Sequence, residues 1–286
     1  MTTASHEGAR RSQQDNGLPA DRTGQLLELA VDAAMAAGRL LLTHQHGVRQ
    51  AATKSSPTDP VTDADRAAEQ LVVDLILGSR PHDAVLAEEG TERPGTSGLR
   101  WVIDPLDGTV NYLYQRPGWV VSIAVEDAEG ALVGVVVEPT TGETFRAVRG
   151  GGAYRGQERL RVADPVATSM ALVGTGFSYR PESRRRQSRQ LAALLPAVRD
   201  VRRTGTCAGD LCALAAGRLD AYCEDELAPW DWAAGALIAR EAGAVVTPLR
   251  APATDHGLVA AGPTLHRELA ELVEPLLEEL PKPTTC

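Results

Sequence analysis

The sequence contains no apolar stretch long enough to cross a membrane. A membrane-spanning helix needs about 18 or more consecutive apolar residues, and no such run occurs. The first 24 residues are polar and charged and lack the apolar segment of a signal peptide. We therefore expect a cytoplasmic protein without a membrane partner, in which residues 1–23 form a disordered polar tail. A targeting role for this tail is the alternative.

Cysteine is scarce, and lysine is almost absent. Cys207, Cys212, Cys223 and Cys286 include no pair at CxxC spacing, and no histidine cluster completes a zinc site. We expect reduced thiols in the core or on the surface of a cytosolic protein. The only two lysines stand beside many arginines, a bias that we attribute to coding composition and that indicates no function.

Positive charge is outnumbered by negative charge. The formal net charge is -9 and the isoelectric point is near 5.2, which argues against nucleic acid or an anionic membrane as the main partner. A small anionic substrate stays compatible with this balance, because bound cations can invert the local field. The 286 residues, 43% of them apolar, are ample for a large core, in one extended domain or in two tightly joined halves.

Periodic apolar patterns predict helices and strands along the chain. A helix is expected at residues 24–45, where apolar residues recur at three- and four-residue spacing. Thr62, with Asp65 three residues later, fits the cap of a helix that ends near Gly78. Short β-type runs over residues 119–162 predict an antiparallel meander.

Helices and strands also alternate on both sides of this meander. Strands are expected at residues 84–87, 100–103, 171–174, 220–223, 244–249 and 258–261, and helices at 182–195, 209–216, 230–242 and from 264 onward. This alternation implies a layered α/β or α+β sandwich. We find no internal repeat and no low-complexity linker, and the arginine run at 184–186 is expected to be a solvated helix face.

The most informative segment is WVIDPLDGTVN, residues 101–111. A buried strand there delivers Asp104 and Asp107, with a proline and a glycine that bend the chain. Both carboxylates and the Leu106 carbonyl can therefore point to one place, and Mg²⁺ favours such a cluster of oxygen ligands. A turn in which aspartate caps the backbone is the alternative, but two aspartates beside a Gly-Thr pair favour metal binding.

Two further acidic segments are weaker signals when taken alone. Glu88 and Glu89 end an apolar strand, where buried unpaired acids are costly and nearby cations would relieve that cost. Asp231 lies in the first turn of a helix that Pro229 and Trp230 lead into, where the helix dipole favours a carboxylate. A surface acidic pair and a simple N-terminal cap are the corresponding alternatives.

Together these segments resemble the inositol monophosphatase family. The family's motifs DPLDGT (104–109), Glu-Glu after a strand (88–89) and WDxAAG (230–235) are all present, and the loop KSxxxDxVTxxD (54–65) also matches. Smaller similarities are Asn111 after DPLDGT, the pair Gly205-Thr206 before a helix, and DAY (220–222) before Glu224. The resemblance covers residues 24–286, which are expected to form the family's phosphatase domain.

The resemblance implies a layered αβαβα sandwich and hydrolysis of a phosphomonoester by metal-activated water, with two or three Mg²⁺ ions per site. One metal would acidify the water and another would stabilise the leaving alkoxide, without a covalent enzyme intermediate. Carried over by position, the metal ligands would be Glu88, Asp104, the Leu106 carbonyl, Asp107 and Asp231, with Asp104 shared by two metals.

The resemblance also assigns roles around the metals. Thr109 and Glu88 would orient the attacking water, and Asp65 would support that water and Thr109. Glu89 would lie beside the site, and Lys54 would lie on the mobile loop that covers it. The family further implies sensitivity to Li⁺ and a homodimer.

The substrate contacts implied by the resemblance come from the same segments. The backbone amides of Gly108 and Thr109 would contact the substrate phosphate, Asp107 would also belong to the substrate-binding residues, and Glu224 would bind a substrate hydroxyl. Ala87 stands where the family often has glycine, with little effect expected. Ala228 stands where inositol-specific relatives can carry a histidine, which weakens the case for inositol.

We interpret the chain as a Mg²⁺-dependent hydrolase of inositol 1-phosphate. Histidinol phosphate, fructose 1,6-bisphosphate and 3′-phosphoadenosine phosphates are alternative substrates, although Glu224 favours a small phosphorylated polyol. A catalytically dead ligand-binding homologue is the non-enzyme alternative, and the complete acidic set argues against it.

Two other enzyme or binding classes fail on spacing. A haloacid-dehalogenase-type phosphatase needs two aspartates two residues apart, whereas Asp104 and Asp107 are three apart. A dinucleotide-binding GxGxxG motif starting at Gly150 would need its third glycine at position 155, which is Arg155, and the context is a meander rather than strand and helix.

Overall fold

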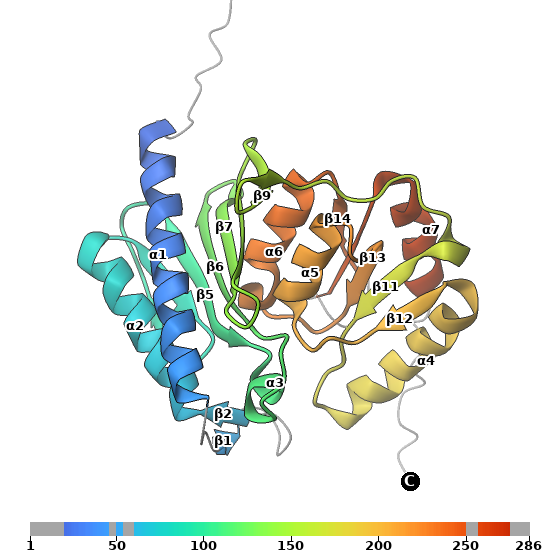
Figure 1. Ribbon diagram of the computed structural model, residues 1–286, viewed down its shortest axis with the longest axis horizontal. Coiled ribbons are helices and arrows are strands. Elements are labelled where there is room, and N and C mark those ends of the chain that lie inside the picture. The colour runs from blue at the N-terminus through green and yellow to red at the C-terminus, as the bar shows by residue number, and fades with distance from the viewer. Residues whose placement is uncertain (1–19, 46–49, 54–59, 250–256, 275–286) are drawn as a thin grey trace, which may run out of the picture.

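The computed structural model describes residues 20–45, 50–53, 60–249 and 257–274 (Figure 1). The helices are α1 (Ala20–His44), α2 (Asp63–Ser79), α3 (Thr109–Leu113), α4 (Pro181–Ala197), α5 (Cys207–Ala215), α6 (Pro229–Glu241) and α7 (Pro263–Val273), with a 3₁₀ turn at Thr168–Met170. None of the described helices combines the length and the apolarity that a membrane crossing requires.

The strands form two large sheets and one small hairpin. The eight-stranded sheet has the order β10-β9-β8-β7-β6-β5-β3-β4, the five-stranded sheet has the order β12-β11-β13-β15-β14, and β1 pairs with β2. The strands are β1 (Gln50–Thr53), β2 (Pro60–Thr62), β3 (Ala84–Ala87), β4 (Glu92–Arg93), β5 (Arg100–Asp107), β6 (Val120–Asp127), β7 (Gly130–Glu138), β8 (Glu143–Val148), β9 (Gly152–Arg155), β10 (Glu158–Arg159), β11 (Leu172–Thr175), β12 (Asp200–Arg202), β13 (Ala221–Glu224), β14 (Val245–Pro248) and β15 (Leu258–Ala261). The run from β6 to β10 is antiparallel throughout, which confirms the predicted meander.

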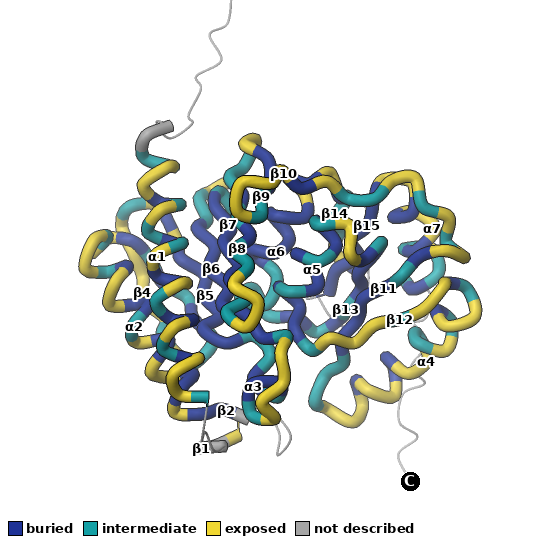
Figure 2. Tube along the Cα trace, viewed as in Figure 1, coloured by how far each residue is buried: buried dark blue, intermediate teal, exposed yellow. Residues whose placement is uncertain are grey.

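Helices and sheets stack in five layers. Helices α1 and α2 cover one face of the larger sheet, α5 and α6 lie between the two sheets, and α4 and α7 cover the far face of the smaller sheet (Figure 1). An apolar core lies between each pair of neighbouring layers. Figure 2 shows the buried residues in dark blue, gathered in the middle of the molecule. The predicted αβαβα sandwich is therefore confirmed.

Strand β5 changes register where it approaches the end of the sheet. Asp104 pairs with Ser122 of β6, and Asp107 pairs with Val120, so three steps along β5 match two along β6. In a regular strand, residues three apart point to opposite faces. The extra residue is a bulge, which re-aims side chains and allows both aspartates to face the same cavity.

The start of α2 confirms the capping signal in the sequence. Thr62 Oγ1 accepts hydrogen bonds from the backbone amides of Ala64 (3.2 Å) and Asp65 (3.3 Å), and Asp65 Oδ2 accepts one from the Thr62 amide at 2.9 Å. This reciprocal capping box satisfies donors that a helix start leaves unpaired. It also fixes Asp65, which is fully buried.

Some expectations differ from the structure. Helix α1 begins at Ala20, so residues 20–23 belong to the helix rather than to the expected tail, whose remainder, 1–19, lies outside the described residues. The expectation that the arginine run at 184–186 is a solvated helix face is wrong for Arg186, which is buried. Short elements without an apolar repeat, such as α3 and β12, were not predicted.

Cys207, Cys212 and Cys223 are free and buried, whereas Cys286 lies outside the described residues.

The contact between β7 and α6 tests the layering. A Cβ added at Gly134 would lie 2.8 Å from the Ala234 carbonyl oxygen and 3.2 Å from its Cα. We expect Gly134→Ala to lower the free energy of unfolding by about 1–3 kcal/mol, since backbone cannot move aside easily. Urea unfolding followed by circular dichroism measures this. The control is Gly78→Ala, near the end of α2 with no neighbour within 4 Å, which should be neutral or stabilising. Equal effects at both positions would contradict the close packing.

Candidate active site

A cavity of about 500 Å³ opens where the two sheets meet. Its walls come from the ends of β3, β5, β11 and β13 and from the starts of α3, α5 and α6. The predicted site residues that line it are Glu88, Asp104, Leu106, Asp107, Gly108, Thr109, Glu224 and Asp231. Segments more than a hundred residues apart in the sequence therefore meet at one place.

The acidic end of the cavity gathers four carboxylates. Asp104 is 1% exposed, while Glu88, Asp107 and Asp231 are half-buried. Burial, together with repulsion from Glu88, Asp107 and Asp231, raises the pKa of Asp104 well above its usual range. Burial and repulsion from Glu88 and Asp107 do the same to the pKa of Asp231. Burial removes these carboxylates from water, and the like charges repel one another, so their ionised forms are costly.

Asp107 is the best compensated of these acids. Burial raises its pKa to about 7, although hydrogen bonds from the Thr206 hydroxyl and the Ala208 amide oppose the rise. Both bonds go to Oδ2, the Ala208 bond at 2.9 Å. Because Thr206 is the N-cap of α5, the second half of the chain orients an aspartate from the first half.

The other aspartates are also oriented through one oxygen. Asp104 Oδ1 accepts from the Leu106 amide at 2.9 Å, and Asp231 Oδ2 accepts from the Ala228 amide at 2.6 Å. Asp231 therefore has the capping role considered for it and faces the cavity as well. In the described part of the chain, no three acidic, histidine or cysteine side chains already form a metal-ligating group.

The donor set nevertheless fits a divalent cation. Carboxylate and carbonyl oxygens are the ligands that Mg²⁺ prefers, and the carboxylates of Glu88, Asp104, Asp107 and Asp231 line the cavity together with Leu106. Burial, and then repulsion from neighbouring carboxylates, raises the pKa values of Asp104 and Asp231, so their ionised forms are costly. A divalent ion would remove that cost.

Thr109 and Asp65 form a buried hydrogen-bonded chain behind the acids. Thr109 Oγ1 lies 3.2 Å from both Asp65 Oδ1 and the Leu106 carbonyl oxygen, to either of which it can donate. Asp65 is held by Thr62 through the capping box, and it does not line the cavity itself. The structure thus brings Asp65 to Thr109, with Thr109 between Asp65 and the cavity.

Gly108 turns the chain between Asp107 and Thr109. Its φ is +100°, and an added Cβ would lie 3.0–3.1 Å from the Gly118 carbonyl and Trp119. Only glycine adopts this conformation without strain. Asn111, two residues after Thr109, donates to the carbonyls of Gly118 (2.6 Å) and Thr204 (2.8 Å). It therefore joins this turn to the loop before α5.

Glu69 is a positioning residue that the sequence did not reveal. It lies one turn after Asp65 on α2 and is 5% exposed. Its carboxylate accepts from the amides of Glu89 (2.7 Å) and Thr91 (3.0 Å) and from the Thr91 hydroxyl (2.6 Å). Glu69 thus fixes the turn after Glu88, and Glu89 takes part through its backbone rather than by lining the cavity. No signal in the sequence separates Glu69 from an ordinary helix residue.

Glu224 and Asp210 add two further acids to the lining of the cavity. Burial raises the pKa of Glu224 to about 8, against the opposing hydrogen bond from the Tyr222 hydroxyl. Burial likewise raises the pKa of Asp210 to about 7, against a hydrogen bond from Thr204 at 2.7 Å. Asp210 and Cys207 were not predicted, because neither stands in a motif that separates it from ordinary helix residues.

Two arginines lie among the lining residues. Arg180 and Arg203 are exposed, and Arg180 Nη2 pairs with Glu226 Oε2 at 2.9 Å. Arg203 lowers the pKa of Asp107, Asp210 and Glu224 through its charge, against the larger effect of burial. Lys54, expected on a covering loop, lies outside the described residues.

Comparison with known proteins identifies one family. The family model described as "Inositol monophosphatase family" matches residues 23–280. The inositol-1-monophosphatase SuhB of Mycobacterium tuberculosis is 45% identical over 229 residues, which cover 76% of this chain and 78% of that protein.

Two further relatives extend the comparison. The Nus factor SuhB of Vibrio cholerae is 39% identical over 245 residues, covering 83% of this chain and 91% of that protein. The crystal structure of the extragenic suppressor protein SuhB from Bartonella henselae superposes with a TM-score of 0.81 at 33% identity, covering 87% of this chain and 98% of that one.

The raised carboxyl pKa values predict how stability depends on pH. Unfolded Asp and Glu titrate near pH 4, whereas folded Asp210 and Glu224 titrate at about 7 and about 8. Between these values the folded state binds more protons, so the free energy of unfolding falls as pH rises, by up to about 1.4 kcal/mol per pH unit for each group. We expect Asp210→Asn and Glu224→Gln to flatten this fall.

The measurement is urea unfolding of chelator-treated protein from pH 5 to pH 8.5. Asp74→Asn, on the exposed face of α2, is the control and should follow the wild type. If Asp210→Asn and Glu224→Gln keep the wild-type slope, the two carboxyls titrate normally and the described burial does not govern them.

Proposed function

We propose that this chain, which belongs to the inositol monophosphatase family, is a Mg²⁺-dependent phosphatase acting on inositol 1-phosphate. The observation that supports this most is the gathering of Glu88, Asp104, Asp107 and Asp231 at one end of a 500 Å³ cavity. Residues 24–286 act as one catalytic domain in this proposal, in a cytoplasmic, Li⁺-sensitive homodimer without a nucleic-acid or membrane partner.

The acidic end would hold two or three Mg²⁺ ions through Glu88, Asp104, Asp107, Asp231 and the Leu106 carbonyl. Bound there, Mg²⁺ supplies an acidified water and neutralises charge on the phosphoryl and leaving oxygens. The protein's part is to keep these oxygens in place. It does so through the amides of Leu106, Ala208 and Ala228, which each hold one oxygen of an aspartate.

Thr109 would align the attacking water. When its hydroxyl proton is directed to Asp65, its oxygen lone pairs are available to a proton of a water in the cavity. Thr62 holds Asp65 from the other side, so the acceptor cannot turn away. Glu88, on the end of β3, would be the second group that orients this water and accepts its proton.

Glu224 would receive a hydroxyl of the leaving group. With its pKa raised to about 8, its carboxyl group can donate or accept a hydrogen bond near neutral pH. This favours a polyol phosphate over histidinol phosphate, whose leaving group carries no further hydroxyl, while fructose 1,6-bisphosphate and 3′-phosphoadenosine phosphates stay alternative substrates. Tyr179 and Leu227 also line the cavity, whose volume of about 500 Å³ leaves room for a ring of hydroxyls.

The first prediction of this proposal concerns Asp104. We expect Asp104→Asn to reduce phosphate release from inositol 1-phosphate to below a tenth of wild-type kcat, a barrier increase of more than about 1.4 kcal/mol, because the most buried of the four carboxylates that would hold the cations loses its charge. Release of inorganic phosphate at saturating Mg²⁺ measures it. Asp74→Asn is the control and should keep full activity. If Asp104→Asn keeps more than a tenth of wild-type kcat, Asp104 is not part of the catalytic centre.

The second prediction concerns Thr109. Thr109→Ala should slow turnover by about 10²- to 10⁴-fold, because the group that aligns the water is lost, while Mg²⁺ still stabilises the fold as in the wild type. The paired measurements are kcat and the Mg²⁺-dependent rise in Tm. Unchanged kcat would show that Thr109 serves only the turn before α3.

The third prediction needs no substrate. A cation that binds only the folded state stabilises it by about 2.7 kcal/mol at a hundredfold excess over its Kd. MgCl₂ should therefore raise Tm more than NaCl at equal ionic strength, and Asp231→Asn should weaken this rise. Equal shifts from both salts in the wild type would mean that the carboxylates form no cation site.

A further inference from the structure

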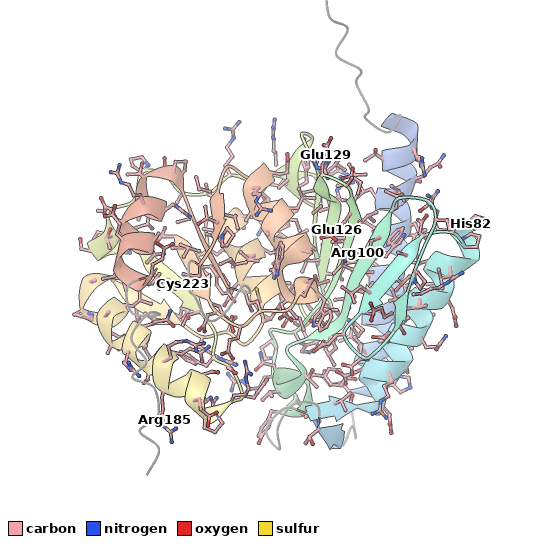
Figure 3. All side chains as sticks on the ribbon, turned by 180° about the vertical axis from the view of Figure 1, so that it is seen from behind. His82, Arg100, Glu126, Glu129, Arg185 and Cys223 are labelled. Carbon is pink, nitrogen blue, oxygen red and sulfur yellow. The ribbon has the colours of Figure 1, made fainter. Side chains whose placement is uncertain are left out.

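Helix α4 carries three consecutive arginines, of which only the third is buried. The side chain of Arg186 is 7% exposed, whereas Arg184 and Arg185 are exposed. Figure 3 shows Arg185 pointing away from α4 at the edge of the molecule. A buried guanidinium is costly unless it is paired and hydrogen-bonded, so the partners of Arg186 reveal what this burial achieves.

Arg186 holds the two residues that follow Glu224. Its Nε donates to Asp225 Oδ2 at 2.8 Å, and its Nη2 donates to the same oxygen and to Glu226 Oε1 at 2.8 Å. Gln187 donates to Asp225 Oδ1, and Ser183 donates to Glu226 Oε1. We call Ser183, Arg186 and Gln187 the α4 clamp. The Asp225 side chain is fully buried.

The clamp also holds the opposite wall of the cavity. Gln187 Oε1 accepts from the Ser178 amide at 2.9 Å. Segments 175–180 and 224–228 both line the cavity, except for Asp225, which points into the clamp. One helix turn therefore connects two walls that come from different strands of the smaller sheet.

The clamped segment has a conformation that it would not adopt alone. Glu226 has a φ of +63°, a left-handed conformation that costs a residue with a side chain about 1 kcal/mol or more. Against the opposing effect of burial, hydrogen bonds from Ser183, Arg186 and Arg180 lower the pKa of Glu226 to about 2. Glu226 is thus held as a carboxylate, and its contacts offset the cost of the turn.

The two walls meet at Glu224. A Cβ added at Gly176 would lie 2.1–2.2 Å from the Glu224 carboxyl group, so this carboxyl lies directly over the glycine. Asp104 and Asp107 are anchored outside these two walls, because Asp104 is held by the Leu106 amide and Asp107 by the Ala208 amide of α5. A change in the clamp should therefore move Glu224 and its surroundings without displacing these two carboxylates.

We propose that the α4 clamp positions Glu224 for the hydroxyl-bearing part of the substrate, and that Arg186 is a positioning residue for polyol phosphates. This inference rests on the proposed phosphatase function and adds a determinant of substrate choice to it. The clamp acts on binding of the leaving group and leaves the chemical step unchanged. A phosphomonoester without hydroxyls does not use Glu224 and is indifferent to the clamp.

The experiment compares Arg186→Lys with Arg185→Lys on two substrates, inositol 1-phosphate and p-nitrophenyl phosphate. Lysine keeps a positive charge beside Asp225 but loses the planar fork that reaches both carboxylates. We expect Arg186→Lys to raise KM for inositol 1-phosphate about fivefold to tenfold, as for the loss of one well-placed hydrogen bond. Its kcat and its KM for p-nitrophenyl phosphate stay at wild-type values, and Arg185→Lys changes nothing.

Thermal melts establish that each variant is folded. If Arg186→Lys does not melt cooperatively, Ser183→Ala replaces it as the test variant, because it removes one hydrogen bond and no charge. We then expect KM for inositol 1-phosphate to rise about twofold, while KM for p-nitrophenyl phosphate stays at the wild-type value. Unchanged KM for inositol 1-phosphate in the folded variant, or equal loss of kcat on both substrates, overturns the inference. A wild type that hydrolyses neither substrate overturns the proposed function, and the inference with it.

Discussion

The confinement of like-charged carboxylates in one cavity is the constraint on which the rest of the structure depends. Asp104 and Asp231 both have pKa values well above the usual range because burial and mutual repulsion disfavour their ionised forms. A fold maintains such an arrangement only where the surrounding contacts over-determine it. In this chain those contacts are backbone amides and the capped start of a helix.

The five layers explain how distant segments reach this cavity. Bulged β5 presents Asp104 and Asp107, α2 supports the site from behind through Asp65 and Glu69, and α6 presents Asp231 from between the sheets. The two halves are joined at the site itself, through Asn111 to Thr204 and through Thr206 and Ala208 to Asp107. The position of the acids therefore depends on both sheets at once.

Much of this could be predicted from the sequence, and the reasons are physical. Strand β3 and helix α2 carry strong local signals, an apolar run and a capping box, and both were placed within a residue of the observed bounds. The motif acids were identified because Asp104 and Asp107 follow a buried strand beside a Gly-Thr pair, and because the acidic segments together resemble the motifs of one family. Their assignment to metals and substrate stays a prediction, as does the role of Lys54.

Other features could not be found in the sequence because they depend on tertiary contacts. Arg184, Arg185 and Arg186 are chemically identical, and only the packing of α4 against residues 225–226 decides which one is buried. Glu69 looks like an ordinary helix residue until the turn at Glu89 and Thr91 is placed above it. Asp210 and Cys207 likewise line the cavity only because α5 packs against β11 and β13 of the smaller sheet.

The central claim is that the buried carboxylates bind protons which cations displace. The most direct measurement is isothermal titration of Mg²⁺ into metal-free protein near pH 6.5, in several buffers with different ionisation enthalpies. The dependence of the observed heat on buffer gives the number of protons released. We expect release of at least about one proton per site, a smaller release at pH 9, and a loss of most of the effect in Asp104→Asn. Binding without proton release at pH 6.5, or no saturable binding, would contradict the account.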